Sequence, residues 1–119
     1  MYGLPADFNT SVFVGQGLES VCFNVNQIHF RFDNKLSISC EGHFAYFTEQ
    51  EEKEQNIQKI PVTSSGVMHL LGHRVVDARA ERDGTLTLRF DNEQRLVFYD
   101  NSPQYEAYHI QIGDKTIIV

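Results

Sequence analysis

Hydrophobic and polar residues alternate along most of this chain with a period of two. The alternation is clearest from Ile28 to Phe32 and from Leu86 to Phe90, where every second side chain is apolar. Because successive side chains of a β-strand point to opposite faces of a sheet, this period predicts strands with one buried face. Asp33-Asn34 and Asp91-Asn92 follow these two stretches, and such residues are typical of tight turns. The pattern therefore predicts antiparallel hairpins.

The stretch from Asp83 to Ile112 carries the densest series of predicted strands and turns. Asp83-Gly84 is a hairpin signal, because glycine adopts positive φ without steric cost. Leu96 to Tyr99 is a continuous apolar run, and Pro103 breaks the pattern that follows it. Tyr105 to Ile112 is the next strand candidate.

The middle of the chain differs in character. Thr48 to Gln58 is polar and has no apolar periodicity, which favours an exposed loop, with a short solvated helix as the alternative. Ser64-Ser65 can cap a short helix that Gly72 would end, so one short helix is expected near residues 64–71.

These elements predict a single domain, residues 1–119, built from two β-meanders. The halves, about 1–48 and 73–119, are joined by the acidic loop and the short helix. Residues 30–34 (FRFDN) match residues 88–92 (LRFDN), which indicates either a duplication or two hairpins that converged on one pattern. Two meanders with one apolar face each would pack against each other or curve into one sheet. The expected fold is mainly β, α+β at most: an antiparallel sandwich or half-barrel with one short helix.

The charge balance restricts the class of partner. The chain has 16 acidic and 10 basic residues and a net charge of −6. This disfavours nucleic acid, since phosphate binding needs a basic surface, and leaves a basic protein partner open. No apolar run reaches the roughly 18 residues of a membrane-spanning helix, and the N-terminus lacks a secretory signal. We therefore expect a cytoplasmic protein without a membrane partner.

The residues that most often carry chemistry form no recognisable motif. Cys22 and Cys40 have no metal-binding spacing, and they are expected either as free thiols or as a disulfide between neighbouring strands. His69 and His73 are four residues apart, but Gly72 would end a helix between them. We expect no catalytic residue, no metal and no cofactor, and hence no enzymatic activity.

An acidic, tyrosine-bearing group in the second half is the main candidate site. Tyrosine is common at interfaces, and carboxylates around it would complement a basic partner. The alternative is a structural role, in which the tyrosines fill the edge of the sandwich. The candidate interface residues are Asp91, Glu93, Tyr99, Asp100, Tyr105, Glu106 and Tyr108. A secondary acidic surface is formed by Glu49, Glu51, Glu52 and Glu54.

The second half also resembles a known group of sequences. The strings LLGHRV (residues 70–75), DGTLTLRFDN (83–92) and LVFYDNSPQYEAYHI (96–110) resemble a widespread family of small bacterial β-rich proteins. Similar strings occur in immunity proteins of polymorphic toxin and contact-dependent growth inhibition systems. The resemblance covers residues 70–112 and brings no catalytic residues. It implies a cytoplasmic immunity protein that neutralises a basic toxin domain, such as a nuclease, in a stoichiometric complex. The alternative is a small-molecule-binding or structural β-domain with a pocket between the halves.

Overall fold

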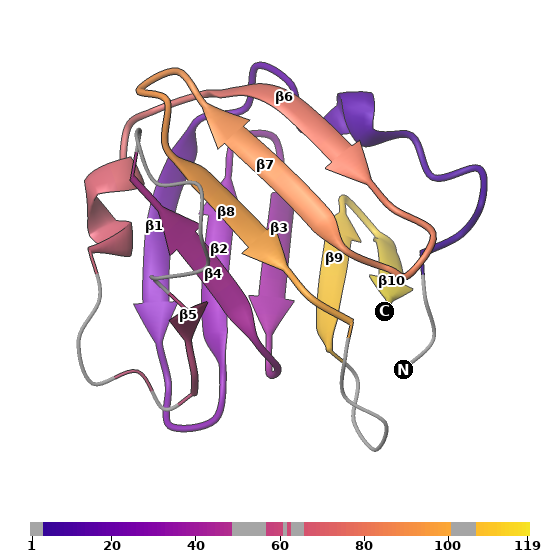
Figure 1. The fold of residues 1–119 in the computed structure, drawn as a ribbon. Helices are drawn as coiled ribbons and strands as arrows, with labels where there is room; N and C mark the ends of the chain where they lie inside the picture. Colours follow the sequence, from indigo (N-terminus) through magenta and orange to yellow (C-terminus); the bar gives the residue numbers. More distant parts are fainter. Residues whose placement is uncertain (1–3, 49–56, 61, 63–65, 101–106) are drawn as a thin grey trace.

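The chain folds into two antiparallel β-sheets that face each other (Figure 1). This computed structural model describes residues 4–48, 57–60, 62, 66–100 and 107–119. The prediction of a mainly β, antiparallel fold is confirmed, and the two open sheets make it a sandwich and not a closed barrel.

Each sheet has five strands within the described residues. The first sheet has the spatial order β1 (Leu18–Phe23), β2 (Ile28–Phe32), β3 (Leu36–Cys40), β9 (Tyr108–Ile112) and β10 (Lys115–Ile118). The second has the order β5 (Ile57–Gln58), β4 (Phe44–Phe47), β8 (Arg95–Phe98), β7 (Leu86–Phe90) and β6 (Val75–Ala80).

The helical content is limited to short 3₁₀ turns in the described residues. The expected short helix is present as η2 (Val67–Leu70), while residues 63–65 lie outside the described part of the chain. A second turn, η1 (Thr10–Val12), precedes Phe13 and Val14. The short apolar run Val12-Phe13-Val14, followed by Gly15 and Gly17, by itself predicts a short strand or loop in this segment. The side chain of Asn9 accepts a hydrogen bond from Ser11 N–H and caps η1, a local signal that the apolar pattern does not contain.

The two halves of the chain complete each other's sheets. β4 and β5 belong to the first half of the sequence, but β4 pairs with β8 in the second sheet, and β5 pairs with β4 at its edge. β9 and β10 belong to the second half, but β9 pairs with β3 in the first sheet and β10 pairs with β9, so the yellow β9 lies beside the purple β3 in Figure 1. The meanders are therefore not separate sheets that stack; they exchange their last strands.

The exchange follows an approximate two-fold relation. Gly15 N–H donates to the Val75 carbonyl. Gly72 N–H donates to the Leu18 carbonyl, which is the equivalent hydrogen bond with the two halves interchanged. An isolated bridge joins Gly17 to Arg74, where the halves meet. β1 and β6 each carry an irregularity at their start in the equivalent place. The short sequence match at residues 30–34 and 88–92 thus marks a repeat that extends through the whole strand order.

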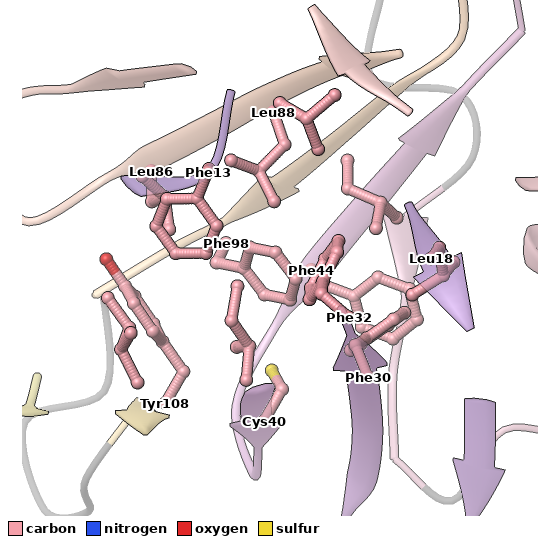
Figure 2. Packing of buried hydrophobic residues seen from close by; sticks show 14 of the residues in the cluster. Phe13, Leu18, Phe30, Phe32, Cys40, Phe44, Leu86, Leu88, Phe98 and Tyr108 are labelled. Carbon is pink, nitrogen blue, oxygen red and sulfur yellow. The ribbon is translucent and has the colours of Figure 1, made fainter. Parts of the chain in front are cut away.

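Aromatic rings fill the space between the sheets (Figure 2). Phe30 of the first sheet lies 5.6 Å from Phe44 and 5.3 Å from Phe98 of the second, measured between ring centroids. Tyr108 of the first sheet lies 5.6 Å from Phe98. Each fully buried ring contributes about 2–3 kcal/mol of transfer free energy, so these contacts hold the layers together. Rings from both sheets therefore pack into one hydrophobic core.

The two cysteines lie on opposite faces of the first sheet and are both free thiols. Cys22 is exposed on the outer face of β1, whereas Cys40 is buried on the inner face of β3. Burial raises the pKa of the Cys40 thiol to about 12. β2 separates their strands, so the alternative of a disulfide is not realised.

Candidate functional site

The turn between β7 and β8 exposes two of the predicted interface residues, Asp91 and Glu93. Glu93 N–H donates to the Phe90 carbonyl at 3.0 Å, and Phe90 N–H donates to the Gln94 carbonyl at 2.8 Å. Glu93 has a φ of +69°, the left-handed conformation that closes a three-residue hairpin loop. The loop therefore presents both carboxylates to solvent at one end of the sandwich.

Asp91 is fixed by the segment that precedes β6. His73 Nδ1 lies 2.7 Å from Asp91 Oδ1, and Arg74 N–H donates to Asp91 Oδ2 at 3.3 Å. The hydrogen bond from His73 is the main reason why the pKa of Asp91 lies below its ordinary value, and the backbone N–H of Arg74 lowers it further. The Asp91 carboxylate is consequently ionised at neutral pH.

Asp33 holds the equivalent position in the first half. Its Oδ2 accepts a hydrogen bond from Gly17 N–H at 3.0 Å and lies 3.4 Å from Arg74 Nη1. Arg74 Nη1 also donates to the Gly15 carbonyl at 2.7 Å. Asp33, His73, Arg74 and Asp91 thus form one group of charged or titratable side chains, here called the end cluster. The tertiary fold assembles it from segments that are distant in the sequence.

Two other predicted interface residues lie inside the molecule, and their assignment to a surface is wrong. Asp100 is 5% exposed and Tyr108 is 0% exposed. Tyr108 alternates with Ile110 on the inner face of β9, and its hydroxyl donates to the Gly84 carbonyl at 2.6 Å. Burial, followed by the nearby Asp100 carboxylate, raises the pKa of Tyr108. The sequence pattern placed Tyr108 and Ile110 on one face but did not determine that this face points inward.

Asp100 and Asp91 also lie at opposite ends of the sandwich. β7 and β8 are antiparallel, Asp91 follows the end of β7, and Asp100 lies beyond the end of β8. A five-residue strand spans roughly 15 Å, so these two carboxylates do not share one surface patch. The structure divides the predicted acidic group into an exposed end and a buried end.

Tyr99 lies half-buried beyond the end of β8. It packs against a small apolar group on the outer face of the second sheet, Ala45, Phe47 and Val97. The guanidinium of Arg95 lies 4.6 Å from the centroid of the Phe47 ring, within the range of a cation–π contact. Tyr99 is thus separate from the end cluster. The remaining predicted residues, Tyr105, Glu106, Glu49, Glu51, Glu52 and Glu54, lie outside the described residues.

Three members of the end cluster, Asp33, His73 and Arg74, are missing from the site residues that were predicted from the sequence. Asp33 can be found from the repeat, because it aligns with Asp91 in the FRFDN and LRFDN strings. His73 is notable in the sequence only as a partner of His69, and Gly72, with a φ of +83°, does separate the two as expected. Arg74 meets Asp33 only because the halves cross at the bridge to Gly17.

A cleft of about 700 Å³ lies at the opposite end, between the N-terminal segment and the end of β6. Leu4 and Phe8 give it an apolar lining, Arg79 and Arg82 add two guanidinium groups, and Glu81 adds one carboxylate. Such a lining suits a small ligand that carries both an apolar part and a negative charge.

Metal-ligand clusters and membrane-spanning helices are two further kinds of feature that the described part of the chain could hold. Within it, no three His, Cys, Asp or Glu side chains are placed so that they could hold a metal ion. Neither short helix of these residues has the length and hydropathy needed to cross a membrane.

The two-layer fold and its charged end define an antiparallel β-sandwich domain with an internal repeat. The chain belongs to the family of unknown function DUF6188, whose model matches residues 10–119. No curated protein and no solved structure gives a significant match.

Proposed function

We propose that this protein is a non-enzymatic binding protein, a cytoplasmic immunity protein that neutralises a basic toxin domain by forming a stoichiometric complex. The observation that carries the proposal is the exposed acidic turn, in which Asp91 and Glu93 project from the end of the sandwich. The resemblance of residues 70–112 to immunity proteins supports the choice of a toxin domain as the partner.

The charge of this surface suits a basic partner. Asp33, Asp91 and Glu93 contribute three carboxylates to this end of the sandwich and Arg74 contributes one guanidinium, a local excess of negative charge in a chain whose net charge is −6. Complementary charges of this kind accelerate association and select the partner, and their effect weakens as salt increases.

The rigidity of the turn also supports a binding role. The backbone hydrogen bonds of the loop and the contacts of Asp91 with His73 and Arg74 fix the carboxylate before a partner arrives. A preorganised group loses less conformational entropy on binding than a flexible one. Asp100 and Tyr108 are excluded from the proposed interface because they are buried.

The proposal is tested with the toxin domain encoded by the adjacent reading frame, purified in an inactive form. Titration calorimetry should give a one-to-one complex, and stopped-flow mixing should show faster association at low salt. Glu93→Lys reverses one charge without removing a hydrogen bond of the end cluster. We expect this variant to weaken binding at least tenfold, which corresponds to about 1.4 kcal/mol, mainly through slower association.

Glu81→Lys is the matched control, because it makes the same change in net charge at the opposite end of β6 and β7, where Glu81 is also exposed. It should leave the affinity within about twofold of the wild type if the acidic turn with Asp91 and Glu93 is the interface. If both variants weakened binding equally, the effect would come from the net charge of the protein and not from the position of the carboxylate. The absence of a complex with the adjacent domain would end the proposal.

A second candidate function, binding of a small amphiphilic anion, is favoured by the cleft near the N-terminal segment. Leu4 and Phe8 would contact the apolar part of the ligand, and Arg82 its charge. A panel of fatty and aromatic carboxylates that raises the melting temperature of the wild type but not of Arg82→Gln would support this function over the first.

A further inference from the structure

The outer face of the first sheet is a second polar surface, distinct from the end cluster and from the cleft. The pairing of the five strands puts one set of alternating side chains on this face. These side chains form two rows across the strands. The first row is Cys22, His29, Ser39, His109 and Ile118. The second row is Ser20, Arg31, Ser37, Gln111 and Thr116.

The charge of this face is opposite to that of the protein as a whole. None of the ten side chains, all of them within the described residues, is a carboxylate, although the chain has 16 Asp and Glu residues. Arg31 provides a permanent positive charge on this face. Glu19, at the bulge of β1, and Glu41, after the end of β3, lie only at the margins. A face with this composition attracts anions locally within an acidic protein.

His29, Ser39 and His109 lie in register on three adjacent strands at the centre of the face. Neighbouring strands are about 4.8 Å apart, so the three side chains span about 10 Å. His29 Nδ1 lies 2.6 Å from Ser39 Oγ. If the hydroxyl donates to Nδ1, His29 Nε2–H is left as a donor, and if Nδ1–H donates, the hydroxyl proton is left. In either tautomer, the pair retains one donor for a ligand.

The central strand of the face carries the smallest side chains. Ser37 and Ser39 of β3 lie between larger side chains, Arg31 on β2 and Gln111 on β9 among them. Ser37 is only 8% exposed although it belongs to the row of the outer face that pairs Arg31 with Gln111 across β3. A small ligand above β3 could therefore accept hydrogen bonds from both sides.

The fold itself does not require polar residues at these positions. Under the two-fold relation, Ser39 and His109 correspond to Val97 and Ala45, which pair in the same way on the second sheet. Gln111 corresponds to Phe47. Those three equivalents are apolar and buried, so the same strand arrangement supports a different outer face. The serine, the imidazole and the amide are properties of this face and not of the architecture.

We propose that the outer face of the first sheet binds a phosphate-type oxyanion, free or as a phosphate monoester, above Ser39. Arg31 supplies the charge of this site, and the His29–Ser39 pair, His109 and Gln111 supply its hydrogen-bond donors. Gln111 Nε2 already donates one proton to the Gly113 carbonyl and keeps the second for the ligand. Phosphate suits this set because its oxygens accept several hydrogen bonds at once from charged and neutral donors. The site is independent of the proposed toxin-binding surface, which lies at the end of the sandwich.

The test is an amide chemical-shift titration of the whole ¹⁵N-labelled protein with inorganic phosphate, and with glycerol phosphate as the monoester, against chloride at equal ionic strength. We expect saturable shifts confined to β2, β3 and β9. Equal affinities would indicate the free ion as the ligand class, and at least tenfold tighter binding of glycerol phosphate would indicate a monoester. Shifts that do not saturate, or that follow ionic strength alone, would overturn the proposal.

The double variant Ser39→Val with His109→Ala installs the residues that the second sheet carries at the equivalent positions, which favours retention of the fold. We expect it to bind at least tenfold more weakly, with an unchanged far-ultraviolet circular dichroism spectrum. Arg89→Gln, on the outer face of the second sheet, is the control that should bind as the wild type does. If the double variant does not fold, Arg31→Gln takes its place with the same expected loss. Wild-type affinity in a folded variant would refute the site.

Discussion

Gly84 lies where two buried polar side chains meet the turn between β6 and β7. Its carbonyl accepts the hydrogen bond of Tyr108, and its φ of +91° is one that residues with a Cβ rarely adopt. A Cβ at this position would lie 2.5 Å from Asp100 Oδ2 and 2.7 Å from Asp100 Cβ. The Asp-Gly hairpin signal is therefore also the packing site of a buried tyrosine and a buried carboxylate.

Gly84→Ala should destabilise the protein by about 3 kcal/mol, because the added methyl group combines backbone strain with a clash against Asp100. Urea unfolding followed by circular dichroism measures this loss. Gly113→Ala is the control: Gly113 also has a positive φ, of +58°, but a Cβ added there would meet no atom within 4 Å beyond its own chain neighbours. That variant should lose only about 1 kcal/mol. Equal losses of unfolding free energy in the two variants would show that the contact with Asp100 does not contribute to the destabilisation.

The two equivalent hairpins of the repeat close with different turns. In β2–β3, Leu36 N–H donates to the Asp33 carbonyl, and both Asn34 and Lys35 have positive φ, as in a type I′ turn. In β7–β8, only Glu93 has positive φ. Lys35 and Glu93 occupy the equivalent last position of each loop, and neither residue favours the left-handed conformation. The strand pattern predicted where these elements end but not the backbone geometry of the turn.

Lys35→Gly should stabilise the protein by about 0.5–1 kcal/mol, because glycine adopts the required φ without the steric penalty of a Cβ. An increase in the urea midpoint with an unchanged slope is the expected result. Lys115→Gly removes the same side chain from β10, where glycine weakens a strand, and it should lower the midpoint. A lower midpoint for Lys35→Gly would show that the charge, and not the turn geometry, dominates at this position.

At the scale of the whole molecule, the exchange of strands makes the halves interdependent. The first sheet is incomplete without β9 and β10, and the second is incomplete without β4 and β5. Phe30 contacts rings from both of the strands that meet in the second sheet, Phe44 and Phe98. We therefore expect one cooperative unit and not two meanders that unfold separately.

Phe30→Leu should destabilise both sheets equally, by about 1–2 kcal/mol, although Phe30 belongs only to the first. Native-state hydrogen exchange measures the effect separately for amides of β2 and of β7. Val25→Ala, at a position that is 75% exposed, should leave the protection of the amides in both strands unchanged. A loss of protection confined to the first sheet would show that the two sheets unfold independently and that the molecule is not one cooperative unit.

The order and type of the strands were readable from the sequence because a period of two is a local property of the chain. Ile28–Phe32 and Leu86–Phe90 were predicted at the bounds that the structure has, and the FRFDN and LRFDN strings already indicated a repeat. The exposed site was predicted in part: Asp91 and Glu93 lie on a turn, and turns are exposed. Asn9 caps a short helix where the apolar pattern predicts a strand or loop.

Only the tertiary structure decided which face of each strand points inward and which strands are neighbours. Alternation states that Tyr108 and Ile110 share a face, but pairing with β3 and packing against Phe98 make that face the buried one. The contact between Arg74 and Asp33 requires the halves to cross, and no local signal encodes a crossing between segments 41 residues apart. The sequence by itself determined the elements and the acidic character of the chain; long-range packing determined which polar side chains remained at the surface.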